Sequence, residues 1–75
     1  MFDDLETLDW QDCAREYTRV ERQIQALTQD VTQRSAIYRV LWEHGGRCDC
    51  TTAFNIVKQP EVRRAVEVAI AEVLR

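Results

Sequence analysis

The chain has 75 residues, 45% hydrophobic and 31% charged, which suits one small globular domain and excludes an intrinsically disordered segment. Two glycines and one proline leave little material for long loops or linkers. The net charge is −3, but residues 1–30 hold eight acidic residues against three arginines, and this acidic half opposes non-specific binding to nucleic acid.

The first predicted element is one long helix over residues 9–44, because neither glycine nor proline occurs between Met1 and His44. Asp9 is its expected N-cap, and His44 followed by Gly45-Gly46 is its expected end, since glycine readily takes the left-handed conformation. Its apolar positions, interrupted only by Arg34, follow an unbroken 3-4-3-4 spacing: Trp10, Cys13, Tyr17, Val20, Ile24, Leu27, Val31, Arg34, Tyr38 and Leu41. Such a narrow seam is the pattern of a coiled coil.

The apolar pattern broadens after Val31, which predicts a segment enclosed by several neighbours. We therefore expect a stem over about residues 9–31 that runs into a compact three-helix head over about residues 33–75. Arg34, the polar position in the seam, either specifies the register or partner of the coiled coil or marks where the stem ends. The broadening of the pattern favours the second interpretation.

Two shorter helices are predicted after the glycine pair. The first is capped by Asp49 or Thr51 and ends near Lys58-Gln59, because the residue before a proline disfavours helix. The second begins with Pro60 at its first helical position and carries a wide apolar face: Val62, Ala65, Val66, Ala69, Ile70, Val73 and Leu74. The predicted fold class is all-α, a single helical domain in which a long heptad-patterned helix precedes two shorter ones.

A chain of this length buries only roughly 60% of the surface that its unfolded form exposes, so association would supply missing burial. We predict a homodimer, built as a coiled coil or helical bundle, whose interface comes from the seam and the last helix: Trp10, Cys13, Tyr17, Val20, Ile24, Leu27, Val31, Val66, Ile70 and Val73. The pattern leaves open whether the strands pair parallel or antiparallel, and whether the helix is continuous through residues 28–33.

A cluster of metal-ligating residue types follows the long helix. His44, Cys48 and Cys50, together with Cys13, would make a Cys3His set that suits tetrahedral zinc. In a straight helix Cys13 lies about 45 Å from His44, so only an antiparallel partner would bring it there. The simpler interpretation makes His44 a helix terminator and the other two loop thiols, and a redox role is a further alternative because Arg47 would favour a thiolate.

No convergent nucleophile, base and cleft is evident, so we expect a protein that is not an enzyme and that needs no cofactor. The helix order over residues 34–75 is compatible with a helix-turn-helix DNA-binding core, which is an alternative function. Its recognition helix would expose three carboxylates that repel phosphate, among Glu61, Arg64, Glu67, Ala71, Glu72 and Arg75. The other interpretation of the same order is that it serves only to bury core residues: Ile37, Leu41, Phe54, Ile56, Val66 and Ile70.

The predicted function is protein–protein interaction, as an adaptor, inhibitor or regulator that presents a helical surface to an unidentified partner protein. Trp, Tyr and Arg dominate binding hot spots, so the expected partner-binding residues are Trp10, Tyr17, Arg39, Arg47 and Arg64. A core position is the alternative for Trp10 and Tyr17. The acidic start lacks the features of a signal peptide, and no stretch approaches the ~18 apolar residues of a membrane span, which predicts a cytoplasmic protein with reduced thiols.

Overall fold

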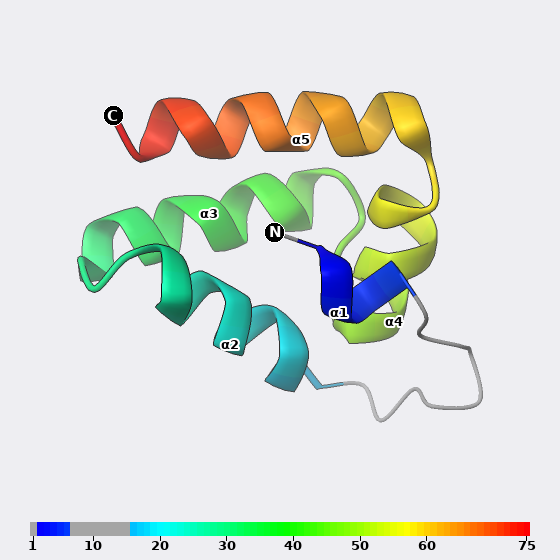
Figure 1. The fold of residues 1–75 in the computed structure, drawn as a ribbon, viewed down its shortest axis with the longest axis horizontal. Helices are drawn as coiled ribbons and strands as arrows, with labels where there is room; N and C mark the ends of the chain where they lie inside the picture. The colour runs from blue at the N-terminus through cyan, green and yellow to red at the C-terminus, as the bar shows by residue number, and fades with distance from the viewer. Residues whose placement is uncertain (1, 7–15) are drawn as a thin grey trace.

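Figure 1 shows the computed structural model of the chain, which describes residues 2–6 and 16–75. In these two ranges the fold is all-helical and has no strand: α1 (Asp3–Glu6), α2 (Thr18–Leu27), α3 (Val31–Glu43), α4 (Asp49–Thr52), the π-helical turn η2 (Ala53–Val57) and α5 (Pro60–Val73). Helix α3 lies between α2 and α5, and α4 with η2 closes one end, where α1 packs against both. The predicted all-α class is confirmed.

The predicted continuous helix over residues 9–44 is wrong, because the chain turns back on itself after Leu27. The backbone is extended at Thr28 (φ −156°, ψ 149°) and at Asp30 (φ −76°, ψ 123°). The Asp30 carboxylate accepts a hydrogen bond from the Gln33 backbone N–H at 3.0 Å and so caps the start of α3. This Asp-x-x-Gln pattern is a helix-start signal that the uninterrupted seam obscured. The other predicted cap, Asp9, lies outside the described residues.

Arg34, the polar position in the seam, holds the turn between α2 and α3. Its Nε donates to the Thr28 carbonyl at 2.8 Å, and its Nη2 donates to the Gln29 side-chain oxygen at 2.9 Å. The first bond satisfies a carbonyl that the end of α2 leaves without an intrahelical partner. Arg34 does mark a boundary, and this boundary is the corner of a helical hairpin inside one chain.

Three predicted helix boundaries are confirmed. Helix α3 ends with His44 as its C-cap, and Gly45 follows with a φ of +88°, a conformation that glycine adopts without strain. The next helical segment ends at Val57, just before Lys58-Gln59. Helix α5 begins with Pro60, whose missing N–H costs nothing in the first turn.

The described helices share one core, formed by Phe2, Leu5, Val20, Ile24, Ile37, Leu41, Cys48, Cys50, Ala53, Ile56, Val57, Val66 and Ile70. Five of the six core residues predicted for the head are among them, and Phe54 packs against them half-buried. The radius of gyration is 11.3 Å, close to the roughly 11 Å of a compact chain of this length. No helix in the described part of the chain is long and apolar enough to cross a membrane.

Several residues of the predicted oligomer interface lie in the core of the single chain. Val20, Ile24 and Val66 are 0% exposed and Ile70 is 4% exposed within the single chain, so they are not available to a second copy. The hairpin explains the burial of Val20 and Ile24, because it lays these two seam positions against the chain's own helices. Tyr17 and Val73 are half-buried against the same core, and Leu27 and Val31 are exposed. Trp10 and Cys13 lie outside the described residues.

Candidate protein-binding surface

Large apolar side chains are exposed at four places among the described residues, and Trp42 is the aromatic one. Leu27, Val31 and Val68 are aliphatic, and single exposed aliphatic residues are normal on a protein surface. Trp42 lies on α3 and is 53% exposed. Exposing so large an apolar ring to water is unfavourable, so the residues around Trp42 are of interest.

The surroundings of Trp42 are built by the turn that follows α3. The Arg47 guanidinium carbon lies 4.5 Å from the centroid of the Trp42 ring, a cation–π stack. The chain reaches this position because Gly45 takes a positive φ and the Gly46 N–H donates to the Leu41 carbonyl at 2.7 Å. The Arg47 N–H donates to the Thr51 hydroxyl at 2.8 Å, so the backbone beneath the guanidinium is held in place.

Arg39 lies three residues before Trp42 on α3 and is exposed, so the two side chains lie on the same side of the helix. Within the described residues, neither Arg39 nor Arg47 forms an ion pair with a carboxylate. We call Arg39, Trp42 and Arg47 the Trp42 surface. It joins two of the predicted partner-binding residues, Arg39 and Arg47, to a tryptophan that directly follows the seam residue Leu41. Arg64, the third arginine predicted to bind the partner, is exposed on α5, and no described contact connects it to the Trp42 surface.

Tyr17, also predicted to bind the partner, contacts the turn that carries Arg47. Its ring meets that of Tyr38 edge-to-face, with centroids 5.4 Å apart and an interplanar angle of 64°. Its hydroxyl donates to the Gly46 carbonyl, which ties the segment before α2 to the turn that carries Arg47. Because Tyr17 is half-buried in these contacts, it positions the turn and offers little surface to a partner.

Burial raises the pKa of both Tyr17 and Tyr38 above the ordinary 10.0, and nearby Cys48 and Glu21, respectively, act in the same direction. Because folding raises these pKa values, each tyrosine contributes to stability as long as it stays protonated. This contribution is fully present below about pH 10 and is lost as the pH rises through the pKa of the folded state. We expect phenolate absorbance to appear at higher pH in folded protein than in urea. The chain has two tyrosines, so Tyr17→Phe assigns each transition. Identical titrations in the two conditions would contradict the described burial.

The start of α2 is held by Asp49, a residue far away in the sequence. The Asp49 carboxylate accepts from the backbone N–H groups of Arg19 and Val20, each at 3.0 Å, and its own N–H donates to the Glu16 carbonyl at 2.8 Å. The N-cap position of α2 itself, Tyr17, provides no side-chain cap. Asp49 thus caps α2 in space, and its negative charge lies at the positive end of the helix dipole.

The sequence predicted Asp49 or Thr51 as the N-cap of the helix that is α4 in the structure, and this prediction is wrong. Its N-cap is Cys48, whose Sγ accepts from the Thr51 N–H at 3.5 Å, while the Thr51 hydroxyl accepts from the Cys48 N–H at 2.9 Å. This reciprocal pair closes the start of α4 and leaves the Asp49 carboxylate for α2. Thr51 does take part in the cap, but from inside the helix.

Asp49→Ala leaves two N–H groups of α2 without an acceptor, so we expect the free energy of unfolding to fall by about 1–2 kcal/mol. Urea denaturation followed by circular dichroism measures the loss. Glu43→Ala is the matched control, because it removes an exposed carboxylate at a helix end and should change stability by less than about 0.5 kcal/mol. Equal losses for the two variants would refute the long-range cap.

The residues of the predicted zinc set do not come together among the described residues. His44 is exposed, with Nδ1 2.7 Å from the Val40 carbonyl. Cys48 is buried as the N-cap of α4, and Cys50 is buried and disulfide-bonded, so Cys50 is not the loop thiol expected. Sulfur in a disulfide is not a thiolate ligand. In residues 2–6 and 16–75 no three His, Cys, Asp or Glu side chains could hold a metal ion, and Cys13 is not described.

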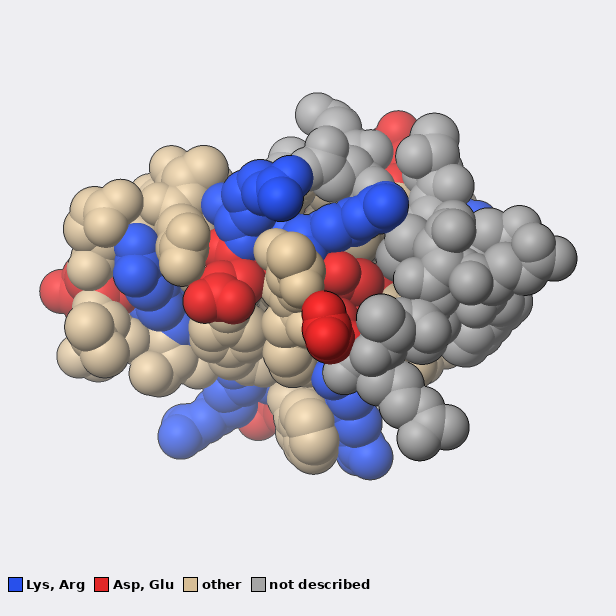
Figure 2. Space-filling view, turned by 90° about the horizontal axis from the view of Figure 1, so that it is seen from below, with Lys and Arg blue, Asp and Glu red and all other residues tan. Residues whose placement is uncertain are grey.

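The charges of the described surface are mixed in sign. Figure 2 shows Lys and Arg interspersed with Asp and Glu over the face that carries α2. On α5, the side chains predicted to be exposed on the recognition helix are exposed, as is Arg75 beyond its end, and three of them are carboxylates: Glu61, Glu67 and Glu72. These faces lack the single-sign basic surface that phosphate binding requires, so they do not support the DNA-binding alternative.

Comparison with known proteins identifies no relative. No protein-family model matches the sequence, and neither curated proteins nor solved structures show significant similarity to it.

Proposed function

We propose that this protein is a small, non-enzymatic helical module that binds a partner protein through the Trp42 surface. The observation that carries the proposal is the stack of the Arg47 guanidinium, 4.5 Å from the centroid of a half-exposed indole, at a turn held by hydrogen bonds. Trp and Arg are the residue types most enriched where alanine substitution abolishes protein binding. Adaptor, inhibitor and regulator are the roles that such a module would serve.

The energetics favour a contact at this position. Trp42 keeps about half of its surface in water, and covering it would contribute on the order of 2–3 kcal/mol. Because Arg39 and Arg47 have no described carboxylate partner, a partner surface with carboxylates beside an apolar patch would complement them. The proposal does not need the predicted homodimer, since the seam residues Val20 and Ile24 are used inside the chain.

The test compares the proteins that immobilised variants of the full chain retain from a lysate of the native host. We expect one set to be retained by the wild type and by Val68→Ala, which removes another exposed apolar side chain, and to be lost with Trp42→Ala. Arg47→Lys should weaken retention, because lysine keeps the charge but loses the planar stack. Circular dichroism checks that each variant folds. Retention of the same proteins in equal amounts by Trp42→Ala would refute the proposal.

The DNA-binding alternative is tested with random-sequence duplex DNA at low salt. The mixed charges of the face in Figure 2 and the three carboxylates of α5 lead us to expect no measurable binding. Binding that weakens steeply with salt and is unchanged by Trp42→Ala would favour the helix-turn-helix interpretation instead.

A further inference from the structure

The N-terminal segment, residues 2–6, lies on the rest of the fold as a short docked ligand would. Phe2 is 1% exposed and Leu5 is 0% exposed, although α1 comprises four residues. A helix this short does not form by itself in water, so its order comes from the surface that receives it. That surface is provided by α4 and η2, which α1 contacts.

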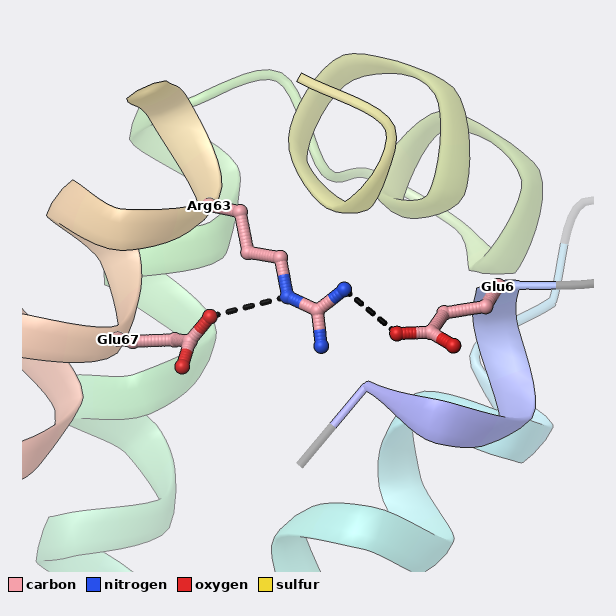
Figure 3. Close-up of polar contacts among 3 residues, drawn as sticks. All are labelled: Glu6, Arg63 and Glu67. Atoms are coloured by element: carbon pink, nitrogen blue, oxygen red, sulfur yellow. Dashed lines mark hydrogen bonds and ion pairs between the residues drawn. The ribbon is translucent and has the colours of Figure 1, made fainter. Parts of the chain in front are cut away.

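Arg63, in the first turns of α5, joins this segment through charge (Figure 3). Its Nη1 lies 2.7 Å from a Glu6 carboxylate oxygen, and its Nε lies 3.0 Å from a Glu67 carboxylate oxygen. Its guanidinium carbon also lies 5.8 Å from the centroid of the Phe2 ring. One arginine, oriented by Glu67, therefore contacts both an aromatic ring and a carboxylate of the segment.

The recognition elements lie within five consecutive residues: an aromatic anchor, a leucine three positions later on the same side of one helical turn, and a glutamate directly after it. Apolar anchors at helical spacing in a groove, with a charge pair at its rim, are how proteins bind short helical peptides. Nothing in these contacts requires the segment to belong to the same polypeptide.

We propose that the surface formed by α4, η2 and Arg63 is a docking site for a short acidic helical segment of a partner protein, of the pattern aromatic-x-x-Leu-Glu, and that residues 2–6 occupy it in cis. The partner segment would then compete with the chain's own N-terminus. This site is separate from the Trp42 surface, and the inference does not rest on the function proposed for that surface.

Competition between a free peptide and the chain's own residues 2–6 determines how tightly the peptide binds. A ligand tethered to its own site typically acts at an effective concentration on the order of mM, so a free peptide binds the wild type weakly. The probe is a fluorescently labelled synthetic peptide with the sequence of residues 2–6, added to the full chain and followed by anisotropy. The double variant Phe2→Ala/Leu5→Ala weakens the cis segment, and we expect it to bind the peptide at least about tenfold more tightly than the wild type does.

Charge reversal supplies the specificity control. Adding Arg63→Glu to the double variant should abolish binding of the peptide, and a peptide in which Glu6 is replaced by lysine should restore it. Adding Arg64→Glu, a neighbouring exposed arginine without a described contact to the segment, should leave binding unchanged. A peptide in which the residues equivalent to Phe2 and Leu5 are both alanine should bind neither the wild type nor the double variant.

A second measurement keeps the test decisive if the double variant fails to fold. Excess peptide added to isotopically labelled wild type should shift amide resonances of α4, η2 and Arg63, and the alanine peptide should not. Absence of these shifts, or equal binding to double variant and wild type, would overturn the proposal. A wild-type dimer that the peptide dissociates would also overturn it, because the segment would then come from a second copy of this chain.

Discussion

Ile24→Ala is expected to lower the free energy of unfolding by about 2–5 kcal/mol, whereas Leu27→Ala should lower it by less than about 1 kcal/mol. The two residues are consecutive seam positions, so a continuous heptad helix would bury them alike. In the hairpin Ile24 is 0% exposed and Leu27 is 40% exposed, because α2 ends at Leu27 and turns away from the core. The pair therefore separates the self-contained fold from a seam that is shared between chains.

The measurement is urea denaturation of both variants at two protein concentrations about tenfold apart. In a monomer the unfolding midpoint does not depend on concentration, whereas in an obligate dimer it rises with concentration. We expect no dependence for the wild type. Comparable losses in the two variants, together with a midpoint that rises with concentration, would show that the seam residues do face a second copy.

Gly46→Ala is expected to cost about 1–3 kcal/mol, because the turn after α3 leaves no space for a side chain. A Cβ at this position would lie 2.7 Å from the Thr52 hydroxyl oxygen, 2.9 Å from Cδ1 of Ile56 and 3.1 Å from the Leu41 carbonyl oxygen. The last of these is backbone and cannot rotate away. The neighbouring Gly45 is constrained differently, by its positive φ, with the Asn55 side-chain amide 3.1 Å from an added Cβ.

A double variant identifies the cause of the loss. The Thr52 hydroxyl is buried and has no hydrogen-bond partner among the described residues, so removing it sacrifices no bond. Gly46→Ala/Thr52→Ala should therefore recover part of the stability lost in Gly46→Ala, measured by urea denaturation. A loss in Gly46→Ala below about 0.5 kcal/mol, or no recovery in the double variant, would show that the packing around this turn is looser than described.

What the sequence determined by itself is local. The end of α3 at His44 and Gly45, the end of η2 before Lys58 and the start of α5 at Pro60 each depend on the conformational limits of one or two residues. Apolar periodicity likewise identified the core faces of α3 and α5. It did so because a 3.6-residue repeat that is buried must be apolar, whatever covers it.

What only the tertiary structure decided is which segment covers each face. The apolar spacing continues across Thr28–Asp30, although Leu27 and Val31 on either side of the turn are exposed, and such a pattern cannot distinguish a second chain from the same chain folded back. Asp49 capping α2, Arg63 binding Glu6 and Arg47 stacking on Trp42 belong to the same class. Each is a contact between residues that only the folded chain brings together, so neither composition nor spacing contained it.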